Sequence, residues 1–346
     1  MLKYHNIQLQ KIAVHKVGNK SLDEGLILTD KLIELEDETL INLFLKYFLT
    51  SFSDTELFEF CNDISVEQNE IFSVSNNIFE NPNSLLSLSK SIAQHLYSCS
   101  THPKIKNGEL YVAYFKNIII DDVTTEAIGI FKSENKDSFL KVDFEGKTSL
   151  VDYDEGANTN KLDKGCLIFN NSNNEYKVSI VDNANKSSEA QYWKDTFLQL
   201  KPIANEYHQT NQFLGIAKNF VTKQISEDFE VSKADKIDLL NRSVDYFKTH
   251  EKFDKSEFEN EVFQDSGIIE SFRSFDTNYR QENEIELTDN FEISPQAVKK
   301  QARVFKSVLK LDKNFHIYIH GNKDLIEQGV DKDGRKYYKI YYEEES

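Results

Sequence analysis

Two histidines, His316 and His320, lie four residues apart in the sequence NFHIYIHG, residues 314–321. On one face of a helix, histidines at this spacing can bind a single zinc ion. However, the residues between and beside them alternate between apolar and polar types, which is typical of a strand. In a strand, residues four apart are separated by about 13 Å along the axis, too far for one zinc ion. The sequence therefore predicts no metal here, with both histidines on the outer face of a strand whose apolar residues face the core.

Acidic residues form the second set that could do chemistry. The sequence VDFEGK holds Asp143, Glu145 and Lys147, which alternation places on one face of a strand. This resembles the D…ExK set with which some nucleases hold Mg²⁺, although those nucleases separate the Asp from the ExK by a further strand. A Mg²⁺-dependent nuclease using Asp143 and Glu145 is therefore kept as a remote alternative. The sequence DYDEG, residues 152–156, lacks the spacing of a calcium-binding EF-hand loop.

The familiar catalytic and nucleotide-binding motifs are missing from the sequence. It contains no GxxxxGK[ST], no strand-linked GxGxxG, no GxSxG and no HExxH. We therefore predict that the protein is not an enzyme and that it has no catalytic, cofactor-binding or metal-binding residues.

Basic residues point to a different activity because they are unevenly distributed. The net charge is −17, and residues 1–190 carry 18 lysines and no arginine against 29 acidic residues. Residues 291–346 carry 11 basic against 9 acidic residues, and all five arginines lie at or after Arg242. This asymmetry predicts one localised anion-binding surface on an acidic protein.

A basic helix is the strongest signal within that region. Ser294 is a suitable N-cap and Pro295 a suitable first residue for a helix with the sequence QAVKKQARVFKSVLK. Within about 80° of the helix circumference, and over about 20 Å of its length, lie five cations spaced by four and three residues: Lys299, Arg303, Lys306, Lys310 and Lys313. A row of this length matches a phosphate backbone with one charge per ~1.7 Å of duplex axis. The predicted contacts on this helix are Lys299, Lys300, Arg303, Lys306, Lys310 and Lys313.

The end of the chain extends the basic region. The sequence DKDGRKYYKIYY predicts a turn and a strand in which tyrosines alternate with cations. Tyrosines among cations can stack on bases, although tyrosines in strands commonly serve packing. The predicted contacts here are Lys332, Arg335, Lys336 and Lys339.

The elements that must position these residues indicate an α+β protein. Short alternating runs at residues 11–35 and 109–182 predict strands, the second group forming an antiparallel meander. Helices are predicted at 37–52 and 84–97, and helices dominate after the polar sequence NANKSSE at 183–189. We expect a β-rich α+β domain at 1–186. A mainly helical domain at 187–346 would end in the basic helix, the strand NFHIYIH, a helical turn KDLIEQG and a closing strand in a small terminal sheet.

Composition and cysteine usage suggest a cytoplasmic protein. Three widely spaced cysteines without a CxxC pair fit a reducing compartment. The N-terminal residues show no apolar signal-peptide region, and no apolar run approaches the roughly 20 residues needed to span a bilayer. We expect no membrane contact.

The chain contains, in this order, IAVH at residues 12–15, KLDKGCLIF, AQYWKDTFL at 190–198, and the terminal LDKNFHIYI and DKDGRKYYKIYY. This order of segments resembles the bacterial 37-kilodalton nucleoid-associated protein family over essentially the whole chain. It implies a cytoplasmic protein that associates with the nucleoid, and it carries no catalytic residues over to this chain. The acidic body departs from what a DNA-coating protein would require and favours a local contact.

These observations lead to one main hypothesis and one alternative. The main hypothesis is a noncatalytic protein that binds the backbone of DNA or RNA through the basic helix and the terminal hairpin. The alternative is an interaction scaffold or subunit whose basic helix docks on an acidic protein partner. A homodimer built partly on the C-terminal half would bury the tyrosines of KYYKIYY and place two basic helices on one face.

Overall fold

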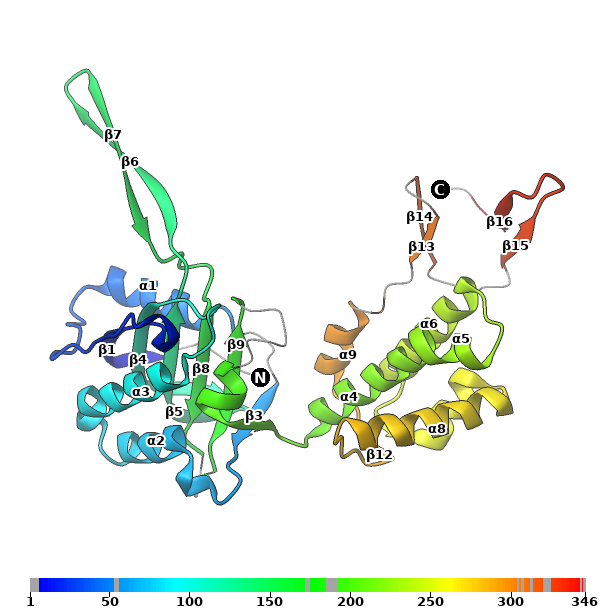
Figure 1. Cartoon of the computed structure of the whole chain (residues 1–346), viewed down its shortest axis with the longest axis horizontal. Helices are drawn as coiled ribbons and strands as arrows, with labels where there is room; N and C mark the ends of the chain where they lie inside the picture. Colours follow the sequence, from blue (N-terminus) through cyan, green and yellow to red (C-terminus); the bar gives the residue numbers. More distant parts are fainter. Residues whose placement is uncertain are drawn as a thin grey trace. The chain divides into compact units, whose positions relative to one another are not determined.

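The computed structural model describes residues 6–52, 56–171, 175–184, 192–303, 305, 308–311, 314–319, 325–342 and 344 (Figure 1). Contacts between residues divide the chain into two compact units, Met1–Ile203 and Ala204–Ser346. The sequence placed the boundary after residue 186. Residues on the C-terminal side of that point contact the first unit: the π-helix η6 (Trp193–Leu198) packs in its core, and β10 (Leu200–Pro202) pairs with β3 (Leu57–Phe60).

The first unit is built on an antiparallel sheet of eight strands in the order β10-β3-β9-β8-β5-β4-β1-β2. Four of the five strands predicted for the meander, β4, β5, β8 and β9, are neighbours in this sheet. The other strands of the sheet are β1 (Gln8–Val17), β2 (Leu26–Ile27), β4 (Gly108–Ile120), β5 (Val123–Ser133), β8 (Lys164–Phe169) and β9 (Lys177–Asp182).

Helices cover both faces of this sheet. On β4, Val112 and Tyr114 pack towards α2 (Glu70–Glu80) and α3 (Leu85–Cys99). The alternating residues Ala113 and Phe115 pack with residues of α1 (Glu38–Leu49). Because both faces are covered, the central strands are apolar on both sides, and all six residues of β8 are buried. The predicted helices at 37–52 and 84–97 correspond to α1 and α3; α2 was not predicted.

A long hairpin leaves the sheet between β5 and β8. Its strands are β6 (Asp137–Glu145) and β7 (Thr148–Gly156), which pair only with each other. Gly146 has φ +65° in the two-residue loop between them, as a type II′ turn requires. Every residue of β6 and all but the last of β7 are exposed. The sequence predicted β6 as part of the meander and missed β7.

The second unit is mainly helical and has a core rich in phenylalanine. Phe213, Phe220, Phe258 and Phe272 are among its fully buried residues. A two-stranded sheet of β11 (Lys252–Asp254) and β12 (Asn290–Glu292) joins the helical segments. The helices are α4 (Glu206–Asn219), η7 (Phe220–Gln224), α5 (Ile225–Asp228), α6 (Lys233–Thr249), α7 (Lys255–Phe258), η8 (Glu259–Phe263), α8 (Ser266–Glu282) and α9 (Pro295–Ala302).

Two small hairpins end the second unit. Strand β13 (Val308–Leu311) pairs with β14 (Phe315–Tyr318), and β15 (Ile326–Val330) pairs with β16 (Lys336–Ile340). A small core joins both hairpins to Ile237 of α6. The predicted terminal strands are confirmed as β14 and β16. The predicted helical turn at KDLIEQG (323–329) is wrong from Ile326 onward, because Ile326–Val330 is extended and pairs with β16 across the DKDG turn; Lys323 and Asp324 lie outside the described residues.

The α+β fold predicted from the sequence is therefore confirmed, with the antiparallel sheet in the N-terminal half and the helices in the C-terminal half. Among the described residues, no helix combines the length and the apolar character that crossing a bilayer requires.

Candidate nucleic-acid interface

Helix α9 carries the first predicted cations. Ser294 is its N-cap and accepts a hydrogen bond from Ala297 N, and Pro295 is its first residue, as predicted. Ala297 and Val298 face the core of the second unit. Lys299 and Lys300 are therefore left on the exposed side of α9, and Arg303 caps its C-terminus in an exposed position.

The prediction that this helix continues through Lys310 is wrong. Helix α9 ends at Ala302, and residues 308–311 form β13, with Leu309 opposite Ile317 of β14. Leu309 and Ile319 are buried with Ile237, so hairpin packing outweighs the local helical periodicity of VFKSVLK. Lys310 lies on β13, where the structure describes its backbone but not its side chain. Lys306 and Lys313 lie outside the described residues. The continuous basic row is thus replaced by separate groups of cations.

A groove of about 830 Å³ lies beside α9, at the C-terminal end of α6. Its apolar lining includes Phe247 and Val298, and its cations include Lys299 and Arg303. Lys248, also on the groove, is 3.0 Å from Asp245, whereas Lys299 and Arg303 pair with no carboxylate among the described residues. The remaining charged or titratable lining residues are His250, Glu251 and Glu292, the last of which pairs with Lys252.

The terminal hairpin carries the second group of cations. Arg335 lies 3.2 Å from Asp331 and 3.0 Å from Asp333, so acids in its own turn compensate it. Lys339 lies 3.2 Å from Glu327 and 4.7 Å from the centre of the Tyr341 ring; hydrogen bonding to Tyr341 and Glu327 raises its pKa. Lys332 and Lys336 are exposed and form no ion pair within the described part of the chain.

The expectations for the strand NFHIYIH are met only in part. His316 lies on β14 and is exposed, opposite Lys310. Ile317 and Ile319 pack in the small core as predicted, but Phe315 is 61 % exposed, because it lies next to the β13–β14 turn. His320 lies outside the described residues.

The candidate nuclease residues lie on the β6–β7 hairpin. Asp143 and Glu145 are exposed on β6, opposite Leu150 and Thr148 of β7. Lys147 lies in the turn rather than on the strand, so the expectation that all three share a strand face is wrong. The sequence DYDEG, weighed above as a calcium loop, is instead the end of strand β7.

The structure assembles one group of potential metal ligands that sequence reasoning missed. His250, Glu257 and Glu261 each offer a ligand atom, and these atoms lie within 4.8 Å of one another. His250 Nδ1 is 3.0 Å from Tyr246 O, which leaves Nε2 directed towards Glu261 at 3.7 Å. Tyr246 OH donates to Glu257 over 3.0 Å. One imidazole and two carboxylates are a donor set suited to a divalent cation.

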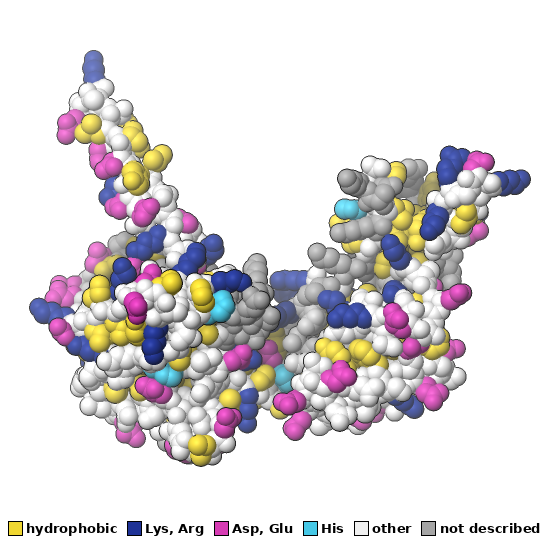
Figure 2. Space-filling view, in the orientation of Figure 1, with side chains coloured by type: hydrophobic (Ala, Val, Ile, Leu, Met, Phe, Trp, Pro, Cys, Tyr) yellow, Lys and Arg dark blue, Asp and Glu magenta, His cyan; other side chains and the backbone are white. Residues whose placement is uncertain are grey.

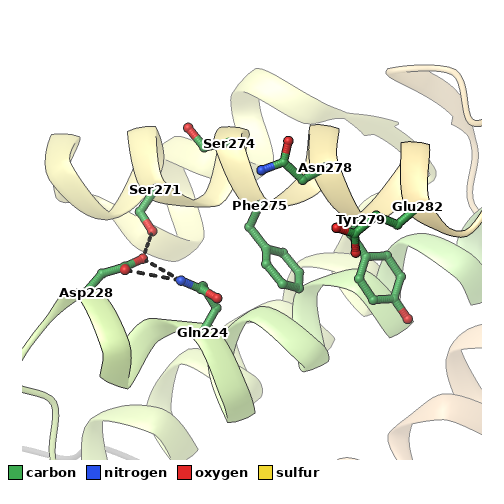
Figure 3. Close-up of a pocket in the computed structure, with 8 residues that line it drawn as sticks. All are labelled: Gln224, Asp228, Ser271, Ser274, Phe275, Asn278, Tyr279 and Glu282. Carbon is green, nitrogen blue, oxygen red and sulfur yellow. Dashed lines mark hydrogen bonds between the residues drawn. The ribbon is translucent and has the colours of Figure 1, made fainter.

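A second groove, of about 480 Å³, runs along α8 and has a different character (Figure 3). Ser271 Oγ donates to Asp228 over 2.5 Å, and Gln224 Nε2 donates to both oxygens of the same carboxylate. Its ionisable lining includes Asp228 and Glu282 but no lysine or arginine. This groove therefore does not suit a phosphate.

Two lysines of the first unit are fully buried, which the sequence did not reveal. Lys132 on β5 is opposite Lys164 on β8, and their ammonium groups lie 5.9 and 5.5 Å from the centre of the Tyr192 ring. Lys132 Nζ lies 3.0 Å from Glu134 and 3.3 Å from Tyr192 OH; burial lowers its pKa. Lys164 Nζ lies 2.6 Å from Asp182. These lysines are structural and cannot contact a nucleic acid from the surface.

Two of the segments that carry the family resemblance meet at these buried lysines. Lys164 comes from KLDKGCLIF and Tyr192 from AQYWKDTFL, and Trp193 Nε1 donates to Gly165 O over 3.3 Å. The IAVH segment lies on β1, where His15 is buried and its Nε2 is 2.9 Å from Ser89 Oγ; burial lowers the pKa of His15. These three segments therefore contribute to the core of the first unit, whereas the remaining two, LDKNFHIYI and DKDGRKYYKIYY, lie in the terminal hairpins of the second unit.

Comparison with known proteins agrees with the resemblance seen in the sequence. No curated protein matches the chain. The NA37 family model, described as nucleoid-associated protein YejK, matches residues 13–335, which is nearly the whole chain. The match spans the sheet of the first unit, the helices of the second and most of the terminal hairpins. The chain therefore belongs to this family of nucleoid-associated proteins.

Proposed function

We propose that this nucleoid-associated protein binds nucleic acid, in the first instance DNA, through phosphate contacts on its second unit. The contacts are Lys299, Lys300 and Arg303 at α9, with Lys332 and Lys336 on the terminal hairpin. Lys306, Lys310 and Lys313, which lie between them in the chain, and the acid-paired Arg335 and Lys339 stay in the proposal as secondary contacts.

The observation that carries the proposal is that these five cations have no acidic partner among the described residues. On the first unit some exposed lysines are paired: Lys116 lies 3.5 Å from Glu126, and Lys136 lies 2.6 Å from Glu109. Others, such as Lys31 and Lys46, have no acidic partner among the described residues, but residues 1–190 carry 18 lysines against 29 acidic residues, whereas residues 291–346 carry 11 basic against 9 acidic residues. A paired lysine gains little from a phosphate because its own carboxylate must first be displaced. An unpaired one can exchange a condensed counterion of the DNA directly.

The cations divide into two groups, which affects how DNA would be held. The groove beside α9 lies at the Phe247 end of α6, whereas the hairpin core packs on Ile237. These residues are ten apart, about 15 Å along a helix. Two groups at such a spacing would contact separate phosphates.

Binding of a labelled duplex, measured by fluorescence anisotropy over a series of salt concentrations, tests the proposal. We expect binding at 50 mM salt that weakens steeply as salt is added, because phosphate contacts release counterions. Single-stranded DNA and RNA of equal length, measured alongside, determine which nucleic acid is preferred.

An acidic protein partner is the second candidate, and the apolar lining of the groove beside α9 favours it. A partner segment with an apolar residue between carboxylates could place that residue on Phe247 and Val298 and the carboxylates on Lys299 and Arg303. If no nucleic acid binds at 50 mM salt, this function replaces the first.

We further propose that the protein acts without catalysis. Asp143 and Glu145, the only carboxylates that the sequence pattern offered to Mg²⁺, are exposed on an isolated hairpin that supplies no enclosed site. Supercoiled plasmid incubated with the protein and Mg²⁺ or Mn²⁺ is expected to stay supercoiled on an agarose gel. Nicking that disappears in Asp143→Ala would instead establish the nuclease.

A further inference from the structure

The β6–β7 hairpin has one strongly apolar face. Residues directly opposite each other in an antiparallel pair project on the same side. Leu140 lies opposite Tyr153 and Val142 opposite Val151, and Phe144 continues the same side. These five residues, here called the apolar face, are 74, 67, 50, 64 and 75 % exposed in that order. Figure 2 shows hydrophobic side chains gathered along one side of the hairpin.

The opposite side, here called the charged face, has a different composition. Its charged residues include Lys141, which lies 2.7 Å from Asp154, and Asp143. It also holds one phenylalanine and one leucine, Phe139 and Leu150, which are 50 and 48 % exposed. The hairpin is thus amphipathic, with the pattern expected of a sheet covered on one side.

A two-stranded hairpin of this kind needs another element packed against its apolar face to be stable. A single two-stranded hairpin is at best marginally stable in water, and packing of one face against another element is what stabilises it. Within the described part of the chain, no other strand pairs with β6 or β7. Contiguous exposed apolar surface of several hundred Å² marks an interaction site.

We propose that the apolar face binds the same face of a second copy of this chain, forming a two-fold symmetric dimer. Two hairpins stacked face to face would give a small four-stranded sandwich, and a two-fold interface uses the same surface on both chains. Taking roughly 150–250 Å² for a fully exposed aromatic side chain and roughly 60–120 Å² for a valine or leucine side chain, the apolar face presents about 330–580 Å². A standard interface buries about 800 Å² per partner, of which about 65 % is apolar in homodimers. The two apolar areas agree.

Charge disfavours nucleic acid and anionic lipid as the occupant of the apolar face. Among its five residues the apolar face holds one ionisable group, Tyr153, and Glu155, opposite Ser138, is the carboxylate on the same side of the hairpin. The charged face bears several carboxylates, and the chain has a net charge of −17. Nucleic acid and anionic lipid would both be repelled by those carboxylates. In the stacked dimer, the two charged faces point outward on opposite sides, separated by both layers of the sandwich. This dimer uses the first unit, whereas the dimer expected from the sequence used the C-terminal half.

The hairpin supplies its own matched control for the test. The variant Leu140→Ser/Phe144→Ser removes one leucine and one phenylalanine from the apolar face; Phe139→Ser/Leu150→Ser removes the same types from the charged face. Mass is measured by light scattering and sedimentation over nanomolar to micromolar concentrations of the full chain. We expect the wild type to have twice the mass of the chain. The apolar-face variant should raise the dimer dissociation constant at least about hundredfold, and the charged-face variant less than about threefold.

Salt distinguishes this association from nucleic-acid binding. Because the interface is apolar and the chains repel each other, added salt should leave the dimer unchanged or strengthen it. Trp193, the only tryptophan of the chain, is buried in the first unit, so unchanged fluorescence would show that both variants retain their fold.

Several outcomes would overturn the proposal: a wild type that is monomeric at micromolar concentration, a dimer that survives Leu140→Ser/Phe144→Ser, or equal effects of the two variants. A monomer that sediments with uncharged phosphatidylcholine vesicles, and loses this in the apolar-face variant, would assign the face to lipid instead.

Discussion

Replacing Lys299, Arg303, Lys332 and Lys336 together with glutamine is expected to reduce the salt dependence of DNA binding by about 3 to 4 in the log–log slope. Each side chain is exposed, and none has an acidic partner among the described residues, so each is free to replace one counterion on a phosphate. The wild type, with these four and Lys300, should show a slope of about 4 to 5, and more if Lys306, Lys310 or Lys313 contribute. At 50 mM salt the variant should bind at least about tenfold more weakly.

The fold should survive this change, because all four side chains are exposed and none of them belongs to a core cluster. Lys300 is left in place because its ammonium lies 5.6 Å from the centre of the Tyr207 ring and contributes to packing. The variant's circular dichroism and thermal unfolding should match the wild type.

A control with the same change in charge comes from the first unit. Lys116, Lys136, Lys177 and Lys201 are each within 3.5 Å of a carboxylate, and replacing all four with glutamine should leave the slope nearly unchanged. If the two quadruple variants bind DNA alike, nonspecific charge rather than the proposed interface governs binding. If both variants and the wild type fail to bind at 50 mM salt, the acidic-partner function takes the place of nucleic-acid binding.

The second large effect is expected from Glu134→Gln, which should destabilise the first unit by about 3–5 kcal/mol. The Glu134 side chain is 2 % exposed and the Lys132 side chain is fully buried, so the ammonium would be left without its counter-charge in a site that excludes water. Lys132 would keep its hydrogen bonds to Lys106 O and Tyr192 OH, but Lys164 would still repel it. Breaking a buried pair on one side is costly because the remaining charge cannot be solvated.

The pH dependence of this effect follows from the pKa of Lys132, which burial lowers. A lysine with a lowered folded pKa binds fewer protons in the folded state than in the unfolded state, so stability increases with pH between the two pKa values. Loss of Glu134 lowers the folded pKa further and widens this range. The destabilisation by Glu134→Gln should therefore be largest near neutral pH and decrease as pH rises towards about 10.

Trp193 fluorescence during urea unfolding measures this effect on the first unit alone, because the second unit has no tryptophan. The control is Glu59→Gln, which removes the partner of Lys201 at 3.1 Å in a half-exposed pair and should cost less than about 1 kcal/mol. Equal losses in the two variants, or a Glu134→Gln loss that does not change with pH, would show that the Lys132–Glu134 pair is not held as a buried charge pair.

Local patterns in the sequence were sufficient for much of the fold. Alternation identified β4, β5, β8 and β14, and capping residues identified the start of α9, because both depend on neighbours within a few residues. The excess of basic over acidic residues at 291–346 could also be anticipated, since it follows from composition along the chain.

The tertiary structure decided where those cations lie and which lysines are available. The sequence from Gln296 to Lys310 is compatible with a helix, but pairing with β14 and burial of Leu309 against Ile237 make its end a strand. Lys132 and Lys164 resemble any other strand lysines in the sequence. They are buried because the pairing of β5 with β8 sets them side by side and Tyr192, distant in the chain, covers them. Such outcomes depend on long-range packing, whose free energy exceeds the small differences in local propensity that a sequence displays.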